Sequence, residues 1–202
     1  VISSAHFEII KITAYKDQLF IMQEIKHTYT VQWVGPFTYE KYRQYIKNEE
    51  TISSEFFNFY YFEAVIDGRY KKRRYLGIHK NNDGIDKRLN TSHEHLKKFL
   101  NAKDLKIWIG SFSNEDNQHE ENIDIVETLL IRAYKDALTE NTKKKKSLPQ
   151  ESICIINMWF NHNDQLQVYA KSKSDIFNDV LIYYDEMDLF LKGDLSKLKI
   201  SE

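Results

Sequence analysis

Residues 57–88 read FNFYYFEAVIDGRYKKRRYLGIHKNNDGIDKR, and they carry the strongest secondary-structure signals of the chain. Aromatic and β-branched residues dominate residues 59–65 and 75–78, and the turn signal Asp67-Gly68 lies between them. This pattern predicts a β-hairpin with a tyrosine on each arm. The second arm leads into a turn-rich segment, after which we expect a helix that carries Arg88.

The segment after the hairpin predicts two short helices. Apolar residues recur at helical spacing over residues 86–100, which favours a helix. The sequence Asn90-Thr91-Ser92 interrupts the pattern with poor helix formers. We therefore expect a first helix with Arg88 and a second helix with His95.

The remaining segments predict strands and helices on both sides of this region. Strands are indicated by β-branched and aromatic residues, and helices by apolar residues that recur every three or four positions. Gly35-Pro36 is expected to end a strand. The predicted strands are residues 7–15, 29–34, 105–112 and 152–157, and the predicted helices are residues 38–48 and 123–138.

Length and composition are those of a globular protein. The chain has 202 residues, of which 42% are apolar, and this is enough to bury a core. No apolar run is long enough to span a bilayer, and the first residues lack the pattern of a secretory signal. The single cysteine, Cys154, cannot form an internal disulfide. We therefore expect a cytoplasmic protein with no membrane partner.

The net charge of −1 argues against a nucleic-acid enzyme, because such proteins usually carry a basic excess. That average conceals two basic runs, one in the predicted hairpin turn and one in a predicted loop. Runs of this kind are either solvated surface segments or sites that bind the phosphates of DNA. The candidate DNA-binding residues are Arg69, Lys71, Lys72, Arg73 and Arg74 in the turn, and Lys143 and Lys144 in the loop.

The hairpin and the helices after it resemble the GIY-YIG nucleases. Asn58-Phe59-Tyr60 stands where that family has Gly-Ile-Tyr, and Tyr75-Leu76-Gly77 stands where it has Tyr-Ile-Gly. Arg88 matches the arginine of the family's first helix. Glu127 and the later Asn141 match the family's glutamate helix and the asparagine after it. The ordered set of these residues is more specific than any one motif.

The resemblance covers residues 57–160 and implies both a fold and an activity. The implied fold is α+β, with a small central antiparallel three-stranded sheet flanked by helices and with extra strands and helices at both ends. The core would be preceded by an N-terminal extension, residues 1–56, and followed by a C-terminal extension, residues 161–202, all packed as one unit. The implied activity is Mg²⁺-dependent hydrolysis of double-stranded DNA, with Mn²⁺ as an alternative ion. A type II restriction enzyme and a homodimer are the forms that this architecture favours.

The resemblance also implies a role for each matching residue. Glu127 would hold one Mg²⁺, a cation that commonly uses only one or two protein carboxylates. Arg88 would bind the scissile phosphate through its fork of donors. Tyr60 and Tyr75 would reach the attacking water. Either Tyr60 or Tyr61 serves as the first of these, because neighbours on a strand face opposite sides.

Family members often have a lysine or a histidine close to the phosphate. Here His79, Lys80 or His93 could fill that place, although a histidine taken alone is more often a surface or structural residue. The chain departs from the family pattern at Asn58, which replaces a glycine, and in a longer segment between Tyr75 and Arg88. The longer segment affects the placement of His79 and Lys80.

Other interpretations of the same residues stay open at this point. Spacing alone favours an exposed Glu127, because glutamate is seldom buried, and Asn141 could simply end a helix. The chain could have the same fold without catalysis and bind nucleic acid or another protein. It could also be an unrelated α+β interaction domain.

Overall fold

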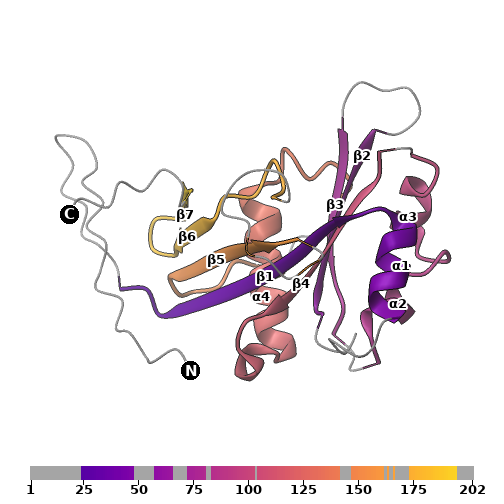
Figure 1. Ribbon diagram of the computed structural model, residues 1–202. Coiled ribbons are helices and arrows are strands. Elements are labelled where there is room, and N and C mark those ends of the chain that lie inside the picture. The colour runs from indigo at the N-terminus through magenta and orange to yellow at the C-terminus, as the bar shows by residue number, and fades with distance from the viewer. Residues whose placement is uncertain are drawn as a thin grey trace, which may run out of the picture.

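The computed structural model describes residues 24–47, 57–65, 72–80, 83–102, 104–141, 147–161, 163, 166 and 173–194. Seven strands form one mixed sheet that curls into a half-barrel (Figure 1). The predicted strand at 7–15 lies outside the described residues. So do the candidate DNA-binding residues Arg69, Lys71, Lys143 and Lys144.

The elements alternate along the chain between strands and short helices. The strands are β1 (His27–Phe37), β2 (Phe59–Val65), β3 (Lys72–Ile78), β4 (Lys106–Phe112), β5 (Ile153–Phe160), β6 (Val180–Tyr184) and β7 (Leu189–Gly193). The helices are α1 (Tyr39–Lys47), α2 (Ile85–Arg88), α3 (Glu94–Phe99) and α4 (Glu120–Ala133), with the 3-10 turn η2 (Glu115–Asn117) before α4. No helix in the described ranges is long and apolar enough to cross a membrane.

The order of the strands in the sheet is β3-β2-β4-β1-β5-β6-β7. All neighbours are antiparallel except β1 and β5, which are parallel. The predicted hairpin is confirmed, because β2 pairs with β3 and places Tyr60 opposite Gly77. Gly35-Pro36 does not end β1; the strand continues to Phe37 with a shift in its register against β4 between Val34 and Phe37.

Two helical layers cover the two faces of the sheet, and each face has its own core. Helix α4 packs its apolar residues against one face, together with Trp33, Tyr61 and Leu76. Helices α1, α2 and α3 cover the other face on the β1, β2 and β4 side, where Tyr60, Phe62 and the helix residues form the second core (Figure 1). Alternate residues of β2 therefore enter different cores.

The predicted fold class is wrong. Instead of a small three-stranded sheet flanked by helices, the structure has one seven-stranded curled sheet with few helices. The reason lies in β1, which hydrogen-bonds to β4 on one side and to β5 on the other. Strands from the predicted N- and C-terminal extensions thereby extend the hairpin's own sheet instead of packing on it as extra elements.

The predicted interruption at Asn90-Thr91-Ser92 is confirmed, since α2 ends at Arg88 and α3 begins at Glu94. Helix α1 begins after Thr38, whose hydroxyl accepts the Lys41 N–H at 3.3 Å. This is the side-chain cap expected of a threonine at that position. Arg88 and His95 therefore lie on two separate helices.

Candidate active site

The strand register determines which tyrosine faces which helices. Tyr60 lies opposite Gly77 and Phe62 lies opposite Tyr75, so Tyr60 and Tyr75 share the face covered by α2 and α3. Tyr61 points to the other face, where its hydroxyl donates to Glu63 at 3.0 Å. The structure therefore pairs Tyr60, and not Tyr61, with the second tyrosine and with Arg88.

The hydroxyl of Tyr60 is the centre of a small polar cluster. His93 Nε2 lies 3.0 Å from it, and the Arg88 Nε–H donates to it at 3.4 Å. The rings of Tyr60 and Tyr75 are 6.1 Å apart between centroids. Three of the residues predicted from the sequence, Tyr60, Tyr75 and Arg88, are therefore neighbours, and His93 joins them.

His93 is held in one tautomer by its position before α3. Its Nδ1 accepts the backbone N–H of Leu96 at 3.0 Å, which caps the helix. A nitrogen that accepts this bond carries no proton, so the neutral ring has its proton on Nε2. His93 therefore donates to the Tyr60 oxygen, which also accepts the Arg88 Nε–H.

The charges around the cluster set its protonation. Burial raises the pKa of Tyr60, while the Arg88 guanidinium and hydrogen bonds from Arg88 and Tyr75 oppose that rise. Burial lowers the pKa of His93 to about 4, and the charges of Arg88 and His95 add to this shift. At neutral pH Tyr60 is thus a phenol and His93 is a neutral imidazole.

His95 is a neighbour of the cluster that the sequence did not single out as a site residue. Its ring stacks on Tyr75, with centroids 4.0 Å apart and planes at 13°. Burial lowers the pKa of His95, Lys98 adds to that shift, and Glu94 and Glu140 oppose it. The available signal in the sequence was its place two residues after His93, in the second short helix.

Asn141 closes the open edge of β3. Its amide oxygen accepts the Leu76 N–H at 2.8 Å, and its amide nitrogen donates to the Leu76 carbonyl at 2.6 Å. The backbone of Glu140 also donates to the Arg74 carbonyl at 3.0 Å. Asn141 therefore imitates a neighbouring strand, and it is not merely a helix cap.

Glu127 lies on α4, in the layer on the opposite side of the sheet from α2 and α3. Its side chain is only 5% exposed, so the reading of an exposed glutamate is wrong. Lys80 forms an ion pair with Asp124 at one end of β3, and Asn141 binds Leu76 farther along the same strand. Glu127 lies between Asp124 and Asn141 in the sequence. Because both of these residues bind β3 or the residues next to it, α4 runs alongside β3, and the carboxylate of Glu127 is buried.

His79 and Lys80 contact acidic residues outside the Tyr60 cluster. His79 Nε2 lies 2.9 Å from Asp83 Oδ1, and its side chain is buried at the end of β3. Lys80 reaches toward α4 and pairs with Asp124. Neither residue therefore contacts Tyr60, Arg88 or His93, and the role predicted for them near a phosphate gains no support from this cluster.

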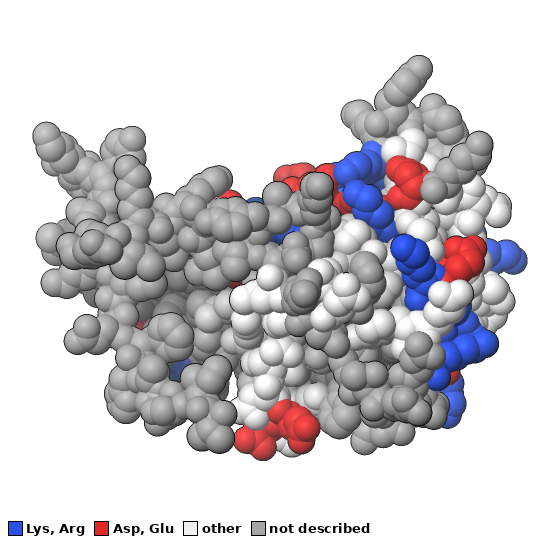
Figure 2. Space-filling view, in the orientation of Figure 1, with Lys and Arg blue, Asp and Glu red and all other residues white. Residues whose placement is uncertain are grey.

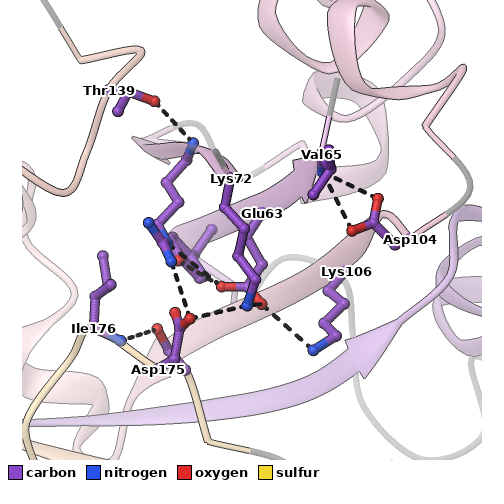
Figure 3. A network of polar contacts seen from close by, with 11 residues as sticks. Glu63, Val65, Lys72, Asp104, Lys106, Thr139, Asp175 and Ile176 are labelled. Atoms are coloured by element: carbon purple, nitrogen blue, oxygen red, sulfur yellow. Dashed lines mark hydrogen bonds and ion pairs between the residues drawn. The ribbon is translucent and has the colours of Figure 1, made fainter. Parts of the chain in front are cut away.

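The basic residues of the hairpin that the structure describes are engaged by acidic side chains. Lys72 Nζ lies 3.4 Å from the buried carboxylate of Glu63, and Lys106 Nζ on the neighbouring strand β4 lies 3.5 Å from it. Both lysines point toward this carboxylate in Figure 3. Lys72 and Arg74 each bind Asp175 at 2.9 Å.

Burial alone would raise the pKa of Asp175, but the hydrogen bonds from Lys72 and Arg74 help to lower it to about 2. Arg73 binds Glu140 at 2.8 Å. The positive charges of Lys72, Arg73 and Arg74 are thus neutralised locally, which weakens the prediction that they bind DNA.

The pKa of His93 predicts a dependence of stability on pH. The unfolded chain binds a proton near pH 6.5 and the folded chain only near pH 4, so this stability is complete above pH 6.5 and is lost as the pH falls. We expect the free energy of unfolding to drop by about 2–3 kcal/mol between pH 7 and pH 4.5 on this account. Urea unfolding at both pH values measures the drop. The variant His93→Asn keeps a capping side chain without the titration, and an equal drop in that variant would contradict the assignment.

No protein-family model, no curated protein and no solved structure matches the chain.

Proposed function

We propose that this protein is a Mg²⁺-dependent nuclease of the GIY-YIG type that hydrolyses phosphodiester bonds in double-stranded DNA. The observation that carries the proposal is the contact of the Tyr60 hydroxyl with both Arg88 and His93, beside Tyr75. These side chains come from strands β2 and β3, from helix α2 and from the residue that caps helix α3. A buried tyrosine in contact with an exposed arginine is a pair suited to phosphate chemistry.

Each residue of the cluster has a distinct task in this proposal. The Arg88 side chain is exposed, so its guanidinium can bind a phosphate while its Nε–H holds the Tyr60 hydroxyl. Burial keeps Tyr60 a phenol at neutral pH, while the hydrogen bonds to its oxygen oppose that effect; only after it has lost its own proton could its phenolate take one from the attacking water. Tyr75 packs beside Tyr60 and fixes the ring. His93 donates to the same oxygen.

Mg²⁺ fits the donor chemistry of Glu127, a buried carboxylate. The described residues contain no group of three or more His, Cys, Asp or Glu side chains that could hold a metal ion. Mg²⁺ needs no such group, because it keeps most of its waters and uses one or two carboxylates, and Mn²⁺ is the alternative ion. Glu127 and Arg88 lie on opposite faces of the sheet, so an ion held by Glu127 would supply positive charge to a phosphate only if that phosphate reached the α4 side.

A second candidate function is the binding of nucleic acid without cleavage. The observation in its favour is burial, since the side chain of Tyr60 is 0% exposed and that of Glu127 is 5% exposed. A residue that touches a water or a substrate must first become accessible. In this alternative the cluster stabilises the fold, and Arg88 alone contacts a phosphate.

The experiment that separates the two functions is cleavage of supercoiled plasmid DNA. Wild-type protein is incubated with Mg²⁺, with EDTA, and with Mg²⁺ after the substitution Glu127→Ala. We expect cutting that requires the metal and is lost in the variant, and discrete fragments would favour a restriction enzyme. An intact plasmid in every lane, together with salt-sensitive DNA binding, would support the second candidate. A homodimer and a cytoplasmic location stay predictions.

A further inference from the structure

The two helical layers of this protein carry opposite charge. Helices α1, α2 and α3 contain seven basic and three acidic residues, a net charge of +4. Helix α4, on the other face of the sheet, contains four acidic residues and one basic residue. Among the described residues, the side formed by α1–α3 is therefore distinctly basic, although the chain has a net charge of −1. That side is the one that covers Tyr60 and Arg88.

The basic side chains of α1–α3 point into solvent and are largely free of acidic partners. The side chains of Lys41, Lys47, Lys87 and Lys97 are exposed. Among the residues that the structure describes, none of these four forms an ion pair, while Lys98 has only a 3.9 Å contact with Glu140. The hairpin cations are the opposite case, because Lys72, Arg73 and Arg74 all bind carboxylates. Within the described part of the chain, lysines without an ion-pair partner are thus found on these helices.

This basic surface is continuous with the candidate active site. Arg88 belongs to both, since it is exposed on α2 and donates to Tyr60. Helix α1 lies next to α2, because both pack into the same core and the charge of Asp86 acts on Tyr42. Figure 2 shows the basic residues gathered along the side of the molecule where Figure 1 places α1, α2 and α3.

We propose that the outer face of α1, α2 and α3 binds the phosphate backbone of duplex DNA. We call this face the helix-layer surface, and it consists of Lys41, Arg43, Lys47, Lys87, Arg88 and Lys97. The proposal rests on the DNA-binding part of the proposed function and holds for both of its candidates. It replaces the hairpin run as the DNA-binding surface. Its chemistry is the release of counterions by exposed lysine and arginine, which needs no base contact.

The test compares two variants that change the net charge equally. The surface variant combines Lys47→Glu and Lys97→Glu, both outside the candidate active site. The control variant combines Lys26→Glu and Lys135→Glu, which reverse two exposed lysines away from α1–α3. Binding to a fluorescein-labelled 24-base-pair duplex is measured by anisotropy at several NaCl concentrations, in EDTA so that cleavage does not interfere.

Each lost phosphate contact reduces the slope of log K against log[salt] by about 0.9. We therefore expect the surface variant to lose about 2 from that slope and to bind at least about tenfold more weakly near 150 mM salt. The control variant should keep the wild-type slope and lose only about twofold in affinity, because distant charges are screened. Circular dichroism confirms that both variants are folded.

Equal weakening in the two variants, or no binding of the duplex by the wild type, would overturn the proposal. The binding and cleavage assays together distinguish a failure of this proposal from a failure of the nuclease proposal. Salt-dependent binding that the surface variant loses, with no cleavage under any condition, supports the helix-layer surface and contradicts the nuclease. Cleavage with equal binding in both variants supports the nuclease and contradicts the surface.

Discussion

Replacing Tyr60 with phenylalanine is expected to lower the rate of plasmid cleavage by about a hundredfold to ten-thousandfold. The substitution keeps the ring and removes only the oxygen that contacts Arg88 and His93. Without that oxygen no phenolate can form, so no base remains at this position. The loss also leaves the buried His93 Nε2–H without its acceptor, which costs about 1–3 kcal/mol of stability.

Tyr61→Phe is the matched control for this prediction. Tyr61 is the next residue on β2, is equally buried, and also loses one hydroxyl hydrogen bond, to Glu63 at 3.0 Å. It faces α4 and not α2, so its loss should reduce stability to a similar degree and leave cleavage within about threefold. Cleavage rates are measured at a temperature at which urea titration shows both variants to be folded. Equal losses of activity would contradict the assignment of Tyr60.

The local elements of this fold could be predicted because their signals are local. The hairpin follows from two aromatic arms around Asp67-Gly68, and β2 and β3 pair as this pattern indicates. The break between α2 and α3 follows from three consecutive poor helix formers. Helix α4 follows from an apolar stripe, and it begins at Glu120, three residues before the predicted start.

The sheet as a whole could not be predicted because its decisive pairing is between distant residues. Strand β1 pairs in parallel with β5 over residues that are more than a hundred positions apart, from His27 opposite Ile153 to Val34 opposite Phe160. Periodicity shows that each segment is a strand but does not say which strand lies beside it. Buried contacts then decide the order, such as the stack of Trp33 on Trp159 at 5.8 Å.

The candidate site was likewise predictable in part. Tyr60, Tyr75 and Arg88 were identified from the order of their motifs in the sequence. The register of β2 and β3 brings them together. The basic residues of the hairpin were selected by composition, which cannot show that Glu63 and Asp175 lie beside them. The lysines of α1 and α3 were overlooked because they are scattered in the sequence. Folding, and not a charge run, gathers them on one side.

Gly77 connects the fold to the candidate site, and its replacement by alanine is expected to disable both. A Cβ at this position would lie 2.5 Å from both Cζ and Oη of Tyr60, which is closer than real contacts allow. The ring cannot move aside freely, because it is fully buried and packs on Phe62 and Tyr75. We expect a loss of about 1–3 kcal/mol in stability from overpacking, and a displaced hydroxyl that no longer meets Arg88 and His93.

The other glycines of the sheet separate the two effects of Gly77→Ala. A Cβ at Gly193 would find its nearest atom at 3.9 Å, so Gly193→Ala should change neither stability nor cleavage. A Cβ at Gly110 would lie 2.9 Å from the Trp33 ring, so Gly110→Ala should destabilise the protein through a different residue.

If Tyr60 acts through its position, Gly77→Ala will lose about a hundredfold in cleavage even where urea titration shows it folded, whereas folded Gly110→Ala will cut. Wild-type cleavage by folded Gly77→Ala would mean that the glycine serves packing alone. Because the clash falls on the very oxygen that Arg88 and His93 hold, a Tyr-x-Gly strand opposite a second tyrosine is one physical unit in which the glycine makes room for the reactive group.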